Sequence, residues 1–109
     1  MSVTRLAFFE GTIKEGCTAA FDHYLEEKLV PLWTQFPGVI GVRLHREIGR
    51  DEGAPSFPLI LSITYASNAA MQEALQSDVR MRSREVTQGL FDYFDGRIYH
   101  VNATALDRI

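Results

Sequence analysis

Four short segments of the chain are rich in β-forming residues, one of them with a clear alternation of hydrophobic and polar positions, and this pattern predicts four β-strands. The segments are 5–13, 39–48, 59–65 and 97–103. Within the second segment, Ile40, Val42 and Leu44 fall on one face. Arg43 and His45 fall on the other, so this strand is expected to have one apolar and one polar face.

Apolar residues recur at spacings of three and four between these segments, which predicts two helical regions. The first region has its apolar face at Phe21, Leu25, Leu29, Leu32 and Phe36. Pro31 lies inside this run and is expected to kink the helix near its last turns. The second region is expected to start at a capping Ser67 or Asn68, to break near Ser77 and to continue to about Phe94.

The predicted order is β-α-β-β-α-β, with turns or loops at Pro37–Gly38, 49–58 and Asp95–Gly96. Right-handed crossovers then favour an α+β, ferredoxin-like fold, in which both helical regions cover one face of a four-stranded antiparallel sheet. The length of 109 residues fits a single domain that spans 1–109.

The second face of such a sheet has no helix to cover it, yet the strands carry apolar residues on both faces. In the first strand, Leu6 and Phe8 alternate with Ala7 and Phe9. Monomers usually avoid an exposed apolar surface of this size. We therefore expect a homodimer in which two sheets pack together as a dimeric α/β barrel.

Composition narrows the choice of partners. The formal net charge is −3, and the densest basic run is Arg80, Arg82 and Arg84, whose alternate spacing is expected to spread the side chains around a helix. Nucleic acid is therefore not an expected partner.

A single cysteine, Cys17, fits a reducing compartment. With no apolar run that resembles a signal peptide or a membrane span, the sequence predicts a cytoplasmic protein with no membrane partner.

Three residues are candidates for catalysis: His45, His100 and Arg43. A histidine can act as a base while a cation beside it holds an anionic or enolic oxygen. The alternative for His45 and Arg43 is that both point to solvent or form ion pairs at the dimer seam. The alternative for His100, which lies in the middle of a strand, is a hydrogen-bonded group at the interface.

Polar strand residues and aromatic residues are the candidates for ligand binding. They are Tyr24, Trp33, Ser62, Thr64, Tyr65, Phe91, Phe94 and Asn102. If the polar faces of strands 59–65 and 97–103 coincide, hydrogen-bonding groups would lie in an apolar wall, as a pocket for a small hydrophobic ligand requires. The alternative is that the aromatic residues form the core and the polar ones satisfy each other in a dimer.

Motifs for the common cofactors are absent from the sequence. There is no Gly-rich phosphate loop, no CxxC, no HExxH and no GxSxG. We therefore expect no metal and no cofactor. Haem binding through His100 or His45 is kept as a weaker alternative.

Residues 19–47 resemble the EthD-like members of the dimeric α/β barrel superfamily. In those proteins the first helix runs into a proline-leucine step, here Pro31–Leu32, and then into a proline-glycine turn, here Pro37–Gly38. Residues 69–80 and 91–101 resemble the same proteins in order and spacing. The resemblance covers nearly the whole chain and implies the fold predicted above.

One departure from the family concerns Leu29, because many EthD-like proteins carry a histidine two residues before the proline of that step. The superfamily includes antibiotic-biosynthesis monooxygenases, haem-degrading enzymes, lactone isomerases and aromatic-polyketide decarboxylases or cyclases, so the fold does not name a reaction. The resemblance implies a cofactor-independent enzyme of oxygenase, decarboxylase or isomerase type that acts on a hydrophobic oxygenated small molecule. The alternative is a non-catalytic dimeric protein that binds a small molecule or has an accessory role.

Overall fold

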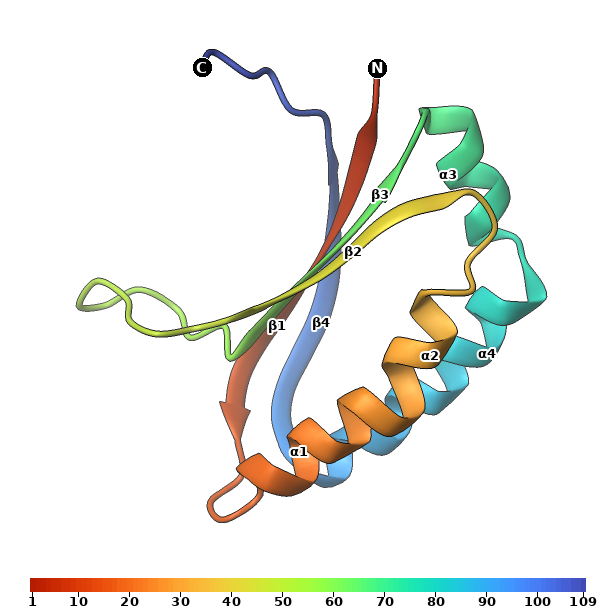
Figure 1. Cartoon of the computed structure of the whole chain (residues 1–109). Helices are drawn as coiled ribbons and strands as arrows, with labels where there is room; N and C mark the ends of the chain where they lie inside the picture. Colours follow the sequence, from red (N-terminus) through yellow and green to blue (C-terminus); the bar gives the residue numbers. More distant parts are fainter.

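The computed structural model describes all 109 residues and contains one four-stranded sheet with every helix on one side (Figure 1). The strands are β1 (Val3–Ile13), β2 (Val39–Arg46), β3 (Leu59–Tyr65) and β4 (Phe94–Ala103). The helical segments are α1 (Thr18–Tyr24), the π-helical η1 (Leu25–Leu29), α2 (Val30–Trp33), α3 (Asn68–Leu75), α4 (Asp78–Thr87) and the 3-10 helix η2 (Gln88–Asp92). The strand order is β2-β3-β1-β4 with every neighbouring pair antiparallel, which confirms the predicted ferredoxin-like fold.

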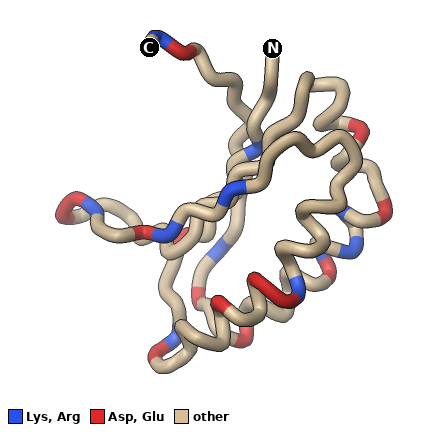
Figure 2. Tube along the Cα trace, viewed as in Figure 1, with Lys and Arg blue, Asp and Glu red and all other residues tan.

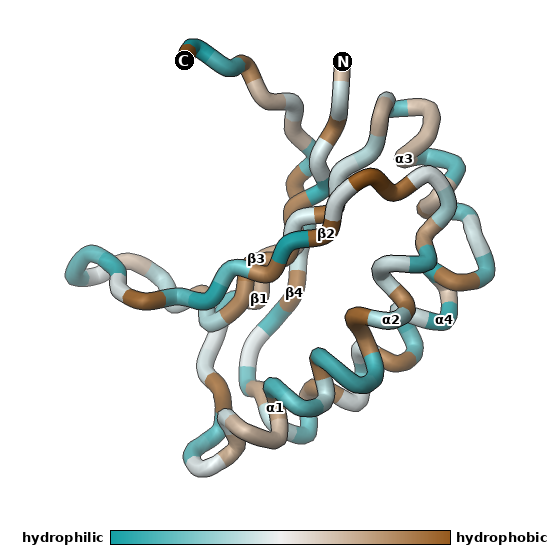
Figure 3. Tube along the Cα trace, viewed as in Figure 1, coloured by the Kyte–Doolittle hydropathy of each residue, from teal (hydrophilic) through white to brown (hydrophobic).

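The first helical run is continuous from Thr18 to Trp33, but its geometry changes in the middle. The π-helical η1 comes directly before Pro31, which lies in the first turn of α2. Proline has no N–H, so the carbonyl of Glu27, four residues earlier, cannot receive the usual helical hydrogen bond and the hydrogen-bond ladder shifts. The disturbance predicted around Pro31 therefore takes the form of a π-helical segment. Figure 3 shows hydrophobic and hydrophilic positions alternating along this run.

Two serines begin the helices of the second helical region, as the sequence predicts. Ser67 Oγ accepts a hydrogen bond from the backbone N–H three residues later at 3.1 Å, and Ser77 Oγ accepts the corresponding bond from Arg80 at 3.3 Å. These bonds satisfy N–H groups that have no partner inside the helix. The chain therefore breaks between α3 and α4 at Ser77, which sets the direction of α4 along the sheet.

The expectation that Asp95–Gly96 forms a turn is wrong, because both residues lie inside β4. Gly96 faces Gly11 of β1. A Cβ on Gly96 would lie 2.1 Å from the backbone oxygen of Glu10, so a side chain does not fit between these strands. The glycine pair allows the close pairing of β1 with β4, and the helical region ends earlier, at Asp92.

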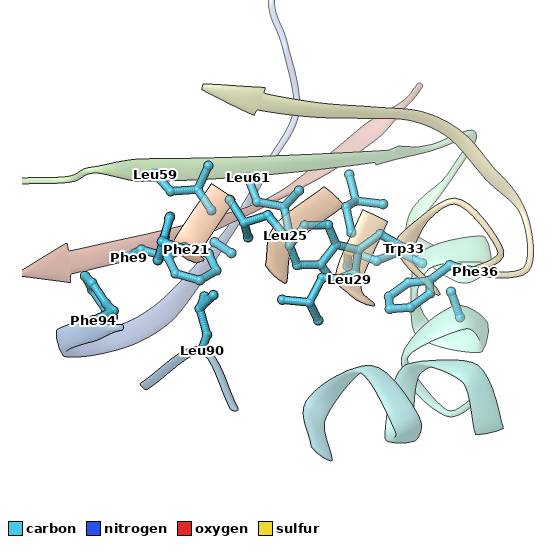
Figure 4. Close-up of a cluster of buried hydrophobic side chains, with 14 of the residues drawn as sticks. Phe9, Phe21, Leu25, Leu29, Trp33, Phe36, Leu59, Leu61, Leu90 and Phe94 are labelled. Carbon is cyan, nitrogen blue, oxygen red and sulfur yellow. The ribbon is translucent and has the colours of Figure 1, made fainter. Parts of the chain in front are cut away.

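The hydrophobic core fills the space between the sheet and the helices. Along the first helical run, the inner side carries Phe21, Leu25, Leu29 and Trp33, followed by Phe36 (Figure 4). Their partners on the sheet are Ala7, Phe9, Leu59, Leu61, Ile63 and Tyr65. Alternation along each strand places these sheet residues on one face, so this face is fixed toward the helices. None of the helices is both long and apolar enough to cross a membrane.

The residues between these core positions form the opposite side of the sheet, which we call the open face. It consists of Leu6, Phe8, Glu10, Arg43, His45, Ile60, Ser62, Thr64, Arg97, Tyr99 and Val101. Figure 1 shows no helix on this side. The Phe8 ring stacks on Tyr99 with 5.7 Å between ring centroids and meets Phe57 of the β2–β3 loop edge to face at 5.5 Å. The open face therefore combines an apolar patch around Phe8 and Tyr99 with polar and charged side chains.

We predict that Gly96→Ala lowers the free energy of unfolding by about 1–3 kcal/mol, because the methyl group would overlap the backbone of β1. Gly49→Ala is the control, since nothing lies within 4 Å of a Cβ at Gly49. Urea denaturation of the two variants measures the difference. Equal stability of the two variants would contradict the close approach of β1 and β4.

Candidate functional site

A cavity of about 270 Å³ lies between the sheet and the helices. Strands β1, β3 and β4 supply one wall, and the opposite wall comes from α2, α3, α4 and η2. Ten of the seventeen lining residues are hydrophobic. The others are Arg5, Arg80, Ser83, Arg84, Thr87, Gln88 and His100. An apolar cavity with a few polar groups is the usual form of a small-molecule site.

Three arginine side chains line this cavity, and no aspartate or glutamate does. Arg80 and Arg84 lie one turn apart on α4, and Arg5 comes from β1. Arg5 Nη1 donates to Asn102 Oδ1 at 2.9 Å, and Arg80 Nη1 donates to the backbone oxygen of Leu75 at 3.3 Å. The four ion pairs of the structure all involve other residues. The positive charge of the cavity is therefore not balanced by any carboxylate of the chain.

The arginines oppose one another's charge. Burial lowers the pKa of Arg5 from its usual value, and the charge of Arg80 lowers it further. Burial likewise lowers the pKa of Arg80, with an added effect from Arg84. A guanidinium stays protonated in proteins despite such shifts, so the cavity holds three like charges that an anion would stabilise.

Tyr65 also lines this cavity. The residue is 0% exposed, and its Oη is a buried polar atom with no hydrogen-bond partner. Burial raises the pKa of Tyr65, while the charges of Arg5 and Arg80 act in the opposite direction. The hydroxyl therefore remains protonated at neutral pH and is free to donate a hydrogen bond to a bound molecule.

His100 lines the cavity from β4, which is an edge strand, so the residue as a whole is exposed. Loss of hydration, followed by the charges of Arg5, Arg80 and Arg84, lowers the pKa of His100 from 6.5 to about 4. The imidazole is therefore neutral at neutral pH.

The lowered pKa also makes stability depend on pH, because the imidazole of His100 binds a proton more readily in the unfolded chain than in the folded one. The contribution of His100 to stability is thus complete above about pH 6.5 and is lost as the pH falls toward 4.

The structure brings four of the sequence-predicted residues to the wall of this cavity: Trp33, Tyr65, Phe91 and His100. Asn102 lies beside them as the hydrogen-bond acceptor of Arg5.

Two of the predicted aromatic residues lie elsewhere in the core. Tyr24 donates its hydroxyl hydrogen bond to the backbone oxygen of Val86 at 2.7 Å. Phe94 is 1% exposed and packs against Phe9, Phe21 and Phe91.

The remaining candidates lie on the open face, on the other side of the sheet from His100. His45 and Arg43 are exposed there, and His45 Nε2 lies 3.3 Å from Ser62 Oγ. Thr64 Oγ1 lies 2.9 Å from Thr4 Oγ1. The register of β1 with β3 and β4 places His100 opposite Ala7, whereas Ser62 lies opposite Leu6. The polar faces of β3 and β4 therefore do not coincide, because neighbouring positions on β1 point to opposite sides.

Sequence reasoning missed the three cavity arginines. The run Arg80, Arg82 and Arg84 was expected to spread around the helix, yet Arg80 and Arg84 are four residues apart and share a face. That spacing is visible in the sequence. The approach of Arg5 to this pair is not, because it depends on how α4 lies across the sheet.

No group of three or more metal-binding side chains is present in the structure. The cavity instead offers guanidinium groups, a phenol and a neutral imidazole, which suit an anionic or oxygenated organic molecule rather than a cation.

The fold places this chain among ferredoxin-like α+β proteins, and the cavity between sheet and helices is its candidate site. An EthD family protein from Bacillus halodurans C-125 superposes with a TM-score of 0.78 at 20% sequence identity, over 97% of this chain and 100% of that one. The resemblance to EthD-like proteins is thus confirmed at the level of the fold.

Two other solved structures illustrate the range of this fold. SnoaB, a cofactor-independent oxygenase from Streptomyces nogalater, gives a TM-score of 0.68 at 18% identity, over 99% of this chain and 96% of that one. A dimeric ferredoxin-like protein of unknown function from Jannaschia sp. CCS1 gives 0.66 at 17% identity, over 96% and 100%. No protein-family model matches the sequence, and no curated protein does.

We predict that Arg84→Gln raises the pKa of His100 above about 4, because one of the three repelling charges is removed. Arg82→Gln is the matched control, since Arg82 lies on the same helix but does not line the cavity. Titration of the imidazole by NMR measures both values. The account of the cavity's charge would fail if the two substitutions shifted the pKa equally.

Proposed function

We propose that this protein is a homodimer whose subunits each bind a hydrophobic, oxygenated small molecule in the cavity between sheet and helices and act on it without a cofactor. The observation that carries the proposal is a cavity lined by ten hydrophobic residues that also has a neutral His100, three arginines and Tyr65 in its wall. The SnoaB structure supports it, because a protein of the same fold is described as a cofactor-independent oxygenase.

The chemistry that suits this arrangement is proton transfer. The neutral imidazole of His100 accepts a proton from a carbon or hydroxyl group of the substrate. The negative charge then develops on a substrate oxygen, where the guanidinium groups and the Tyr65 hydroxyl stabilise it. Isomerisation would return the proton to another atom of the same molecule. In oxygenation the deprotonated substrate would itself reduce O2, with one oxygen atom entering the product as a carbonyl and the other leaving as water. In decarboxylation the carbon that loses CO2 would take up a proton.

Non-catalytic ligand binding is the second candidate function, and one observation favours it. A pKa of about 4 makes His100 a weak base while the cavity is empty. A His100→Gln variant distinguishes catalysis from non-catalytic binding. An enzyme would lose turnover and keep its affinity for the substrate, whereas a binding protein would show no turnover in either form.

The open face supports the proposed dimer. No helix covers it, and Val101 on this face is 47% exposed. Figure 1 shows the β2–β3 loop and the C-terminal segment projecting on the side away from the helices. Both carry exposed apolar residues, including Ile48 in the loop and Leu106 near the C-terminus. A second copy on this face would bury the sheet, and the β2–β3 loop and the C-terminal segment would contact its sides.

We predict that Val101→Asp weakens or abolishes the dimer, because the carboxylate would enter an apolar interface. Met81→Asp is the control, since Met81 is similarly exposed, at 54%, but lies on α4 away from the open face. Light scattering at micromolar concentration gives the mass of each variant. A monomeric wild-type protein, or a dimer that withstands Val101→Asp, would contradict this assembly.

The cavity itself can be tested through Trp33, the one tryptophan of the chain, which lines it. Ligands that enter are expected to change its fluorescence. Ser83→Leu should weaken their binding about tenfold or more, because Ser83 is a buried cavity residue and the larger side chain occupies ligand space. The control Gln72→Leu lies on the exposed side of α3. Titration with a panel of phenols, β-diketones and aryl acids provides the measurement, and unchanged affinity in Ser83→Leu would place the site elsewhere.

A further inference from the structure

We propose that the cavity recognises a carboxylate carried by an apolar body of about one aromatic ring, held by Arg5, Arg80 and Arg84 together with the hydroxyl group of Tyr65. This inference rests on the proposed small-molecule function and specifies its ligand class.

The charge distribution is the first argument. The whole chain has a formal net charge of −3, yet the lining of its cavity has three arginines and no acidic residue. Figure 2 shows acidic residues on the first helical run, in the β2–β3 loop and on α3 and α4, and none of them lines the cavity. Burial and the charge of Arg80 lower the pKa of Arg5, and burial and the charge of Arg84 lower the pKa of Arg80, so an anion beside them reduces the cost of keeping both groups charged.

The geometry is the second argument. Arg80 and Arg84 approach from successive turns of α4, and Arg5 approaches from β1, so donors meet from both walls. A guanidinium presents a flat pair of N–H groups that matches the two oxygens of a carboxylate. The hydroxyl of Tyr65 supplies a further donor that nothing in the protein uses. A planar anion therefore satisfies groups that the chain leaves unsatisfied.

The rest of the lining sets the size and character of the ligand. Trp33, Phe36, Leu75 and Phe91 contribute apolar surface to the same cavity. Its volume of about 270 Å³ equals the space of about nine liquid water molecules. One aromatic ring with a short acidic arm fits this space.

Binding of such an anion has a consequence for His100. Its pKa of about 4 reflects burial together with the charges of Arg5, Arg80 and Arg84. A bound carboxylate offsets those charges and raises the pKa toward its usual value. The imidazole then becomes a stronger base only when the cavity is filled.

The test compares acids with their isosteric neutral amides. The ligands are titrated into the protein while Trp33 fluorescence is followed. The pairs are phenylacetate and phenylacetamide, benzoate and benzamide, and 3-phenylpropionate and its amide. We expect at least one acid to bind about tenfold or more tightly than its amide, as charge-assisted hydrogen bonds require. In the same complex the pKa of His100, followed by NMR, should rise with the acid and stay unchanged with the amide.

Variants of the arginines and the tyrosine assign the head group. Arg80→Gln and Arg84→Gln should each remove most of the preference for the acid, while Arg82→Gln keeps it. Tyr65→Phe should weaken binding of the acid without destabilising the empty protein, because the hydroxyl has no partner there. A folded Tyr65→Phe protein with unchanged affinity for the acid would remove Tyr65 from the site.

The outcomes separate this inference from the proposed function. If acid and amide bind equally well and Ser83→Leu weakens the binding of both, the proposed carboxylate recognition is wrong, while the cavity remains the ligand site. Tighter binding of phenyl phosphate than of every carboxylate overturns it as well, in favour of a phosphate. If no member of any pair changes the fluorescence of Trp33 or the NMR spectrum at millimolar concentration, both the ligand class and the cavity's role are contradicted.

Discussion

Repulsion among three guanidinium groups in one cavity is the feature on which the functional account depends. Arg5, Arg80 and Arg84 share the space between sheet and helices with no carboxylate beside them. Burial, followed by these charges, lowers the pKa of His100, and Arg5 and Arg80 also act on the unpartnered hydroxyl of Tyr65. An uncompensated charge in a partly buried place is costly, and a protein commonly retains such a group where a ligand supplies the missing partner. The cavity thus supplies the cationic partner of an ion pair, and a bound anion would supply the other.

The fold explains how these groups come together. Each strand alternates between two environments, so β1 presents Arg5, Ala7 and Phe9 to the helices and the residues between them to the open face. The helix α4 forms part of the opposite wall and brings Arg80 and Arg84 to the same cavity. The Gly11–Gly96 pair allows β4 to lie close to β1, which carries His100 to the same wall. The two faces of one sheet therefore have different roles. One face lines the ligand cavity, and in our proposal the other forms the dimer interface.

Much of the fold could be predicted from the sequence, because it depends on local patterns. The alternation in 59–65 predicts β3 to the residue, and the serine caps at Ser67 and Ser77 mark the starts of α3 and α4. The turn expected at Asp95–Gly96 was wrong, because the role of Gly96 is set by its partner Gly11, far away in the chain. Local signals do not report such a pairing.

The site was harder to predict, since it depends on the register between strands. Trp33, Tyr65, Phe91 and His100 were chosen for their residue type and do line the cavity. The sequence does not show that Ser62 and Thr64 lie on the other side of the sheet from His100. Arg5 was missed because a single arginine in a strand carries no distinguishing pattern until its neighbours are known.

The most direct measurement of the central claim is a crystal structure of the protein with 4-bromophenylacetate, in which anomalous scattering locates the bromine. The account predicts a bromine peak among the aromatic side chains of Trp33, Phe36 and Phe91, with the carboxylate directed at Arg80 and Arg84. A peak on the open face beside His45, with the cavity holding only water, would contradict it.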